Sequence, residues 1–98
     1  MTIRFHKFVQ RDVNSILNQY YSISGELAEA FWGEFNLYLS RIEENPRRYG
    51  FWKNTKFRRA NLEQFPYLIF YEEYYKLARI LVVRHENRHP DYGLKRRF

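Results

Sequence analysis

Hydrophobic and polar residues alternate over residues 3–8, in the order Ile-Arg-Phe-His-Lys-Phe. A period of two predicts a half-buried β-strand. From Val9 onward the period changes, because apolar residues then recur every three or four positions. This spacing predicts a helix of about three turns. The residues on its apolar face are Val13, Ile16, Leu17 and Tyr20.

The next segment predicts a second and longer helix between Ser24 and Pro46. Ser24 is suited to cap its N-terminus, because a serine hydroxyl accepts a hydrogen bond from a backbone N–H of the first turn. Asn45 ends it, because the residue before a proline is pushed out of the α region. The apolar stripe of this helix consists of Leu27, Phe31, Phe35, Leu39 and Ile42. A break of three or four residues separates the two helices and predicts an antiparallel helical hairpin.

After Pro46 the helical period does not return. A strand is expected near residues 55–62, after a turn region around Gly50. Residues 67–75 and 78–85 are rich in aromatic and β-branched side chains, which favour strands, and a short Lys76-Leu77 connection between them predicts a β-hairpin.

This order of elements predicts an α+β fold. Three consecutive strands form an antiparallel meander, and the first strand joins them at an edge or beside the last, which gives a twisted four-stranded sheet with the helices on one face. At 98 residues, the chain is expected to form one domain over residues 1–98. We expect the other face of the sheet to be open to water or to a partner.

Charge divides the chain into two halves. Residues 1–45 carry four Lys/Arg and six Asp/Glu, whereas residues 46–98 carry thirteen and five. The second half is therefore the one expected to meet a polyanion. The segment over residues 47–59 has six cations and no acid within it. The acidic pair Glu72-Glu73, farther along the chain, is interpreted as solvated charge. Aromatic residues make up 20% of the chain, so some are expected at the surface as well as in the core.

Composition narrows the chemistry further. The chain has no cysteine, which removes thiolate chemistry and cysteine-based zinc sites. His6, His85 and His89 fall on different predicted elements without ligand spacing, so no metal and no cofactor are expected. The opening residues do not look like a secretory signal, and no stretch is apolar enough to span a membrane. We expect a cytoplasmic protein.

Several segments in this order resemble the RelE/ParE superfamily of type II toxins. The likeness covers residues 3–90, and the matching pieces are Asp12-Val13 after the opening strand, the helix end Ile42-Glu43-Glu44-Asn45-Pro46, Arg58-Arg59, the strand Phe65-Pro66-Tyr67-Leu68-Ile69-Phe70-Tyr71, and Ile80-Leu81-Val82-Val83-Arg84-His85 with Arg88-His89-Pro90. The resemblance implies the fold given above, growth inhibition inside bacterial cells, and neutralisation by a cognate antitoxin.

Two mechanisms occur within that superfamily. RelE-like members are ribosome-dependent mRNA endonucleases, and ParE-like members inhibit DNA gyrase by binding it. The long helical hairpin looks more like ParE-type toxins, which favours gyrase modestly. A third possibility is a non-catalytic nucleic-acid-binding module that uses the basic sheet without chemistry.

The enzyme interpretation needs groups that move protons and hold a phosphate. His85 is the best candidate for acid/base work, because its ordinary pKa is close to neutrality. Similarity to mRNA-cleaving relatives places Arg58 or Arg59 against the scissile phosphate, although a regular strand directs only one of the two to the open face. Arg88 or Arg84 would complete the clamp, and Tyr92 or Phe98 would stack on a base.

Further candidates for binding lie in the basic half. These are Arg47, Arg48, Lys53, Lys56, Arg84, Tyr92, Arg96 and Arg97. The resemblance implies an antitoxin segment that folds on binding, and we expect it to be acidic. It would lie as a helix against the helical hairpin or as an added strand at the sheet edge.

Overall fold

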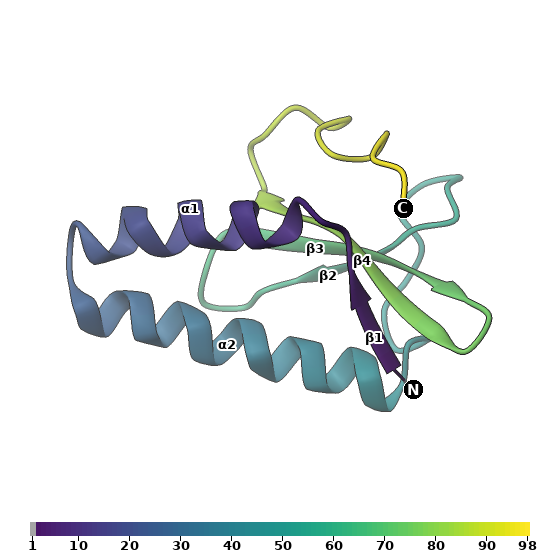
Figure 1. Ribbon diagram of the computed structural model, residues 1–98, viewed down its shortest axis with the longest axis horizontal. Coiled ribbons are helices and arrows are strands. Elements are labelled where there is room, and N and C mark those ends of the chain that lie inside the picture. Colours follow the sequence, from purple (N-terminus) through teal and green to yellow (C-terminus); the bar gives the residue numbers. More distant parts are fainter. Residues whose placement is uncertain (1) are drawn as a thin grey trace.

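In the computed structural model, which describes residues 2–98, two helices and four strands follow each other in the predicted order (Figure 1). The elements are β1 (Thr2–Phe5), α1 (Val9–Tyr21), α2 (Gly25–Glu44), β2 (Arg58–Asn61), β3 (Tyr67–Tyr74) and β4 (Leu77–His85). No helix in this part of the chain is long and apolar enough to cross a membrane.

The helix ends are set by the residues that the sequence indicates. The Ser24 hydroxyl accepts a hydrogen bond from the Leu27 N–H at 3.3 Å, which caps α2. Asn45, just before Pro46, has an extended backbone, with φ at −149°, and ends the helix. By contrast, β1 is shorter than predicted, because the chain turns at His6, whose Nδ1 accepts a hydrogen bond from the Phe8 N–H at 3.1 Å.

The sheet has the order β1-β4-β3-β2, so the first strand lies beside the last, as one of the two predicted arrangements requires. β1 pairs with β4 in parallel, and the other pairs are antiparallel. The β3–β4 hairpin turns at Tyr75-Lys76, one residue before the predicted connection. The pairing is irregular between Phe70 and Tyr71, where Leu81 is an extra residue in β4.

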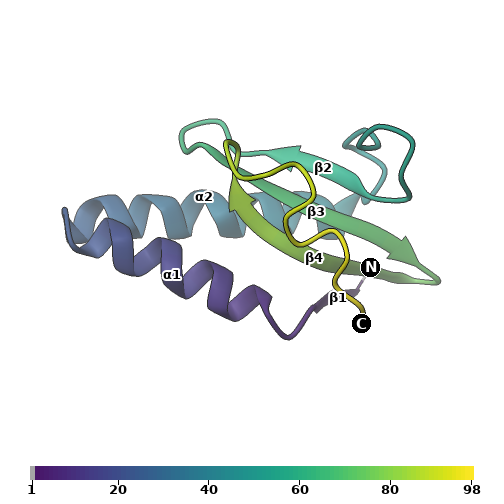
Figure 2. The same ribbon diagram turned by 90° about the horizontal axis from the view of Figure 1, so that it is seen from above.

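The two helices cover one face of the sheet and enclose the larger core (Figures 1 and 2). Phe31 and Ile42 of α2 are fully buried against Ile69 and Tyr71 of β3, and α1 contributes Ile16. Thus the predicted apolar stripes of both helices point into this layer. Aromatic rings fill much of it, in agreement with the high aromatic content of the chain.

The opposite face of the sheet is not open, so that prediction was wrong. A second apolar cluster lies there, in which the strand residues Leu68, Phe70, Leu81 and Val82 are covered by Trp52, Phe57, Tyr92 and Leu94. Figure 2 shows the C-terminal segment crossing the sheet on this side. The covering residues come from irregular segments without a hydrophobic period, which is why the sequence pattern did not show them.

Three contacts fix the C-terminal segment on the sheet. Gly93 has φ at +79° and lies so close to Val82 that a Cβ atom would be 2.5 Å from its Cγ2. Arg96 forms a buried ion pair with Asp12 of α1. The carbonyl of Arg97 is 2.9 Å from Nε2 of His6, which donates the hydrogen bond.

Candidate functional site

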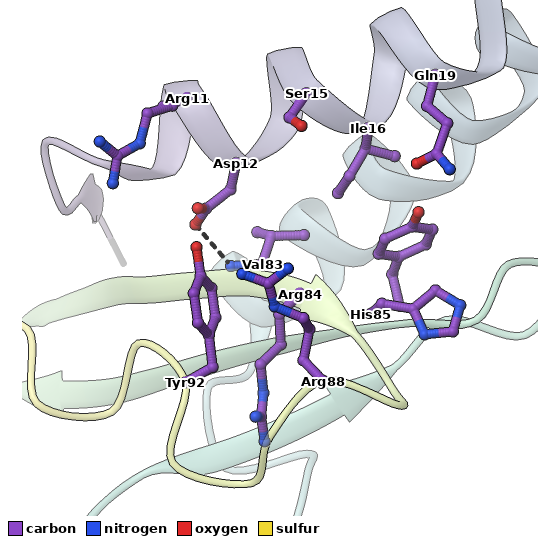
Figure 3. A pocket seen from close by; sticks show the side chains of 11 residues that line it. Arg11, Asp12, Ser15, Ile16, Gln19, Val83, Arg84, His85, Arg88 and Tyr92 are labelled. Carbon is purple, nitrogen blue, oxygen red and sulfur yellow. Dashed lines mark hydrogen bonds between the residues drawn. The ribbon is translucent and has the colours of Figure 1, made fainter.

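A polar groove of about 290 Å³ lies between α1, the end of β4 and the segment that follows it (Figure 3). It brings together His85, Arg88 and Tyr92, three of the residues singled out in the sequence. The lining residues are Arg11, Asp12, Ser15, Ile16, Gln19, Tyr67, Val83, Arg84, His85, Arg88 and Tyr92.

His85 stands at the end of β4, where its ring meets the edge of the Tyr67 ring at a centroid distance of 5.2 Å. Its Nδ1 atom accepts a hydrogen bond from the Asn87 N–H at 3.0 Å. A backbone N–H can only donate, so in the neutral ring the proton is on Nε2. With Nδ1 bound to the backbone, Nε2 of His85 is the ring atom that can donate a hydrogen bond to an anion.

The carboxylate of the groove is also engaged. Asp12 receives two hydrogen bonds from Arg96, at 2.6 and 2.8 Å, and a third from the Val83 N–H at 3.2 Å. Burial raises the pKa of the Tyr67 hydroxyl to about 12, with a smaller contribution from Tyr20. The Asp12 carboxylate is therefore occupied by donors, and the Tyr67 hydroxyl keeps its proton near neutral pH.

The exposed charges of the groove are positive. Arg88 packs over Tyr92, with its guanidinium carbon 4.0 Å from the ring centre, and Figure 3 shows its side chain turned toward Val83. Arg11 lines the same groove from α1 and packs over the ring of Phe8 at 4.3 Å. Such a surface suits an acidic partner more than an acid/base reaction.

The remaining predicted catalytic arginines do not join this groove. Arg58 lies on the helix side of the sheet, where it donates to the carbonyl of Tyr49 at 2.8 Å. Arg59 lies on the opposite face, over the ring of Trp52 at 4.4 Å, so the two adjacent arginines are separated by the sheet. The predicted cluster of arginines on one bare face therefore does not exist.

Arg84 is a structural residue of the second face. Its side chain runs away from the groove in Figure 3, packs over Phe70 at 4.7 Å and donates to the carbonyl of His89. Only 4% of the residue is exposed. Burial, with the nearby charge of Arg59, lowers the pKa of its guanidinium below the ordinary value. Arg84 thus holds the segment after β4 in place through its hydrogen bond to the His89 carbonyl.

The basic run over residues 47–59 is partly neutralised by acids of β3. Arg47 pairs with Glu73 at 3.2 Å, and Lys56 pairs with Glu72 at 3.4 Å. Glu72 is only 4% exposed and also binds Arg79, so its interpretation as solvated charge was wrong. These pairs reduce the self-repulsion that the sequence suggested.

The other predicted binding residues have mixed positions. Lys53 lies over Trp52 and Arg48 over Tyr49, at 4.8 and 5.9 Å, and both are exposed. Arg97 is exposed as well. In contrast, the Arg96 side chain is only 9% exposed and is committed to Asp12, so it is not free to bind a partner.

Sequence reasoning gave Asp12 no role in the site. Its position carried a signal, because Asp12 comes three residues after Val9 and four before Ile16, on the buried stripe of α1. An acid at such a position requires a buried partner. That partner, Arg96, is 84 residues away in the sequence, and no local pattern identifies it.

A second groove, of about 490 Å³, is mainly apolar and lies between β1, α1 and α2. Trp32 of α2 stands in its wall with 48% of its surface exposed. Its lining residues are Phe5, His6, Lys7, Val9, Gln10, Val13, Asn14, Trp32, Phe35, Asn36 and Leu39. The adjacent β1 pairs only with β4, so its outer edge is unpaired among residues 2–98.

Comparison by sequence finds no matching family model and no matching curated protein. Comparison by structure finds a chain of the solved structure described as "Chromosomal ParDE TA system from P. aeruginosa". The two chains superpose with a TM-score of 0.76 and 16% sequence identity, over 87% of this chain and 95% of that chain. The protein therefore has the RelE/ParE-like fold that its sequence predicts.

Proposed function

We propose that this protein is the toxin of a type II toxin–antitoxin module, acts in the bacterial cytoplasm and is held inactive by a cognate antitoxin. The observation that carries the proposal is the likeness in fold to a chain of a ParDE system over nearly the whole of both chains. The net charge of +6 supports it, because such a charge favours acidic partners.

Within this class, we propose inhibition of DNA gyrase by binding rather than cleavage of mRNA. Attack by a ribose 2′-OH requires a group that removes its proton. Nδ1 of His85 already accepts a hydrogen bond, the Asp12 carboxylate is bound by Arg96, and the pKa of Tyr67 is raised to about 12. A protein-directed inhibitor needs no such group.

The apolar groove is the proposed site of the antitoxin. A helix of the antitoxin would lay apolar side chains against Trp32 and Leu39, and a following strand would pair with the free edge of β1. The other edge of the sheet is less accessible, because Arg59 N–H donates to the carbonyl of Gly50 at 3.1 Å and so pairs β2 with a loop of its own chain.

Two reactions with purified protein separate the mechanisms. We expect the protein to inhibit plasmid supercoiling by gyrase and to leave mRNA intact in a translation extract. His85→Ala and His89→Ala form a matched pair, because His89 also accepts a backbone N–H at Nδ1 but lies outside the groove. Cleavage of mRNA that His85→Ala abolishes and His89→Ala retains would establish the nuclease alternative and refute gyrase inhibition as the mechanism.

The antitoxin site is tested with the protein of the neighbouring gene. Trp32→Ala should weaken its binding about tenfold or more, because exposed tryptophans in apolar grooves dominate interface energies. Leu37→Ala is the control, since Leu37 is equally exposed on α2 but does not line the groove. Equal affinities of the two variants would place the antitoxin elsewhere.

A further inference from the structure

The tip of the β3–β4 hairpin carries an exposed aromatic pair. Tyr74 is 45% exposed and Tyr75 is 86% exposed, and their rings meet edge to face at a centroid distance of 4.7 Å. Figures 1 and 2 show this tip at one end of the molecule, with the connection between α1 and α2 at the other. The tip is thus a protrusion on the side of the molecule away from the helical turn.

The backbone at Tyr75 has an unfavourable conformation. Its φ angle is +56°, in the left-handed region, where the first position of a two-residue hairpin turn normally has glycine, asparagine or aspartate. Burial does not compensate for this conformation, because most of the ring faces water. Packing therefore gives no reason for a tyrosine at this position, and strained backbone positions cluster at functional sites.

The supporting side chains hold the tip in one arrangement. The Arg79 guanidinium lies between two rings, 3.7 Å from the centre of Tyr74 and 4.3 Å from that of Phe98. Its Nη2 atom donates to Glu72 at 2.5 Å, and only 18% of the Arg79 side chain is exposed. Because Arg79 packs against the Tyr74 ring, Tyr75 projects from a supported base. Little conformational freedom of the tip would therefore be lost on binding.

The surroundings of the tip are positively charged. Arg4 of β1 is the register partner of Arg79, so both lie on the same face of the sheet. Lys56 reaches Glu72 at 3.4 Å, and Lys76 is the exposed second residue of the turn. Arg79 and Lys56 pair with the buried Glu72 carboxylate, and Arg4 and Lys76 add positive charge to the same end of the sheet.

We propose that the hairpin tip is the surface through which the toxin binds its protein target, with Tyr75 entering an apolar pocket that is rimmed by carboxylates. This inference rests on the proposed function. Exposed tyrosine and arginine side chains dominate the binding energy of protein interfaces when they fill pockets of the partner. The cations around the tip match an acidic rim.

A single-stranded nucleic acid fits the tip less well. Sites for such strands are grooves in which successive bases stack on open ring faces. Here Arg79 already covers one face of Tyr74, and Tyr75 protrudes as a knob. The apolar groove proposed for the antitoxin is lined by β1, α1 and α2 and includes no residue of the hairpin tip.

Tyr75→Gly tests the proposal, because glycine adopts the backbone angle of Tyr75 without strain and the variant should fold. Its matched control is Tyr21→Ser, which removes a tyrosine with 56% exposure at the other end of the molecule. We expect Tyr75→Gly to lower gyrase affinity about 30-fold or more and to abolish growth inhibition, while antitoxin affinity stays within about twofold. Tyr21→Ser should keep all three properties.

The outcomes separate this inference from the proposed function. If the wild-type protein inhibits growth but not gyrase, the gyrase proposal fails, and loss of toxicity in Tyr75→Gly alone still supports the tip as the target surface. If Tyr75→Gly is as toxic as the wild type, the tip proposal is overturned and the toxin proposal stands. If Tyr75→Gly loses binding to a single-stranded DNA oligonucleotide but still inhibits gyrase, the proposal that Tyr75 enters a pocket of a protein target is overturned. A wild-type protein without toxicity refutes both.

Discussion

Replacing Arg96 by methionine should strongly destabilise the protein. Arg96 donates to both carboxylate oxygens of Asp12, at 2.6 and 2.8 Å, and to the carbonyl of Leu81 at 3.2 Å. The two side chains are only 9% and 4% exposed. Methionine has a similar shape but no charge, so Asp12 would remain buried with one backbone donor, the Val83 N–H.

The expected cost follows from this uncompensated carboxylate. Removing one partner of a buried ion pair typically costs about 3–5 kcal/mol. A domain of this size has a free energy of unfolding of about 5–15 kcal/mol, so the loss is a large fraction of the total. Release of the C-terminal segment would also expose Leu81 and Val82 of the second apolar cluster.

Urea unfolding followed by circular dichroism measures the effect. Asp12→Leu should cost a similar amount, because it leaves the Arg96 cation buried instead. The double variant should be much less destabilised than the sum of the two single variants, since no unpaired charge remains.

The effect should not depend on pH around neutrality. The hydrogen bond and charge of Asp12 raise the pKa of Arg96 above the ordinary value of an arginine. A raised pKa of a cation stabilises the fold at all pH values below the ordinary pKa of arginine, and this contribution is lost only in more strongly alkaline solution. A loss of less than about 1 kcal/mol in Arg96→Met, or additive effects in the double variant, would refute this account of the ion pair.

Three further predictions concern stability. Gly93→Ala should cost about 1–3 kcal/mol in urea unfolding, because the new Cβ would lie 2.5 Å from Val82 Cγ2; an unchanged midpoint would contradict the close approach. Burial raises the pKa of Tyr67 and of Tyr71 to about 12, so the unfolded chain loses these phenolic protons at a lower pH than the folded protein does. The free energy of unfolding should therefore fall between pH 10 and 12, by about 2–3 kcal/mol for each tyrosine. Unfolding free energies and ultraviolet absorbance across this range measure it, and a flat profile would be inconsistent with it. Tyr75→Gly should melt no lower than the parent, as relief of a left-handed φ offsets the lost ring contact; a lower melting temperature would show that the ring supports the fold.

The sequence predicted the elements where local chemistry determines them. Ser24 caps α2 and Asn45 ends it, as their residue types indicate. The strand pattern over β3 and β4 predicted the hairpin, and the short connections limited the topology to very few arrangements. These features depend on periodicity and on neighbouring residues, which a single sequence displays directly.

The candidate site depends on features that local patterns do not carry. Leu81 is an extra residue in β4, so Leu81 and Val82 both contribute to the second apolar cluster, and strict alternation cannot place Arg84 and His85. The segment after β4 looks like basic turn sequence, but Tyr92 and Leu94 pack on the sheet. Apolar side chains within a charged terminal segment were the signal that this segment folds back.

Enclosure of β3 on both faces has a consequence for how the protein opens. Residues 67–72 are buried without interruption, because helices lie on one side and the C-terminal segment on the other. Either cover can detach while the other still shields the strand, so the amide hydrogens of the β3–β4 hairpin should exchange with deuterium most slowly. Proteases acting on such partly open states would then cut the flanking layers first and leave the hairpin until global unfolding.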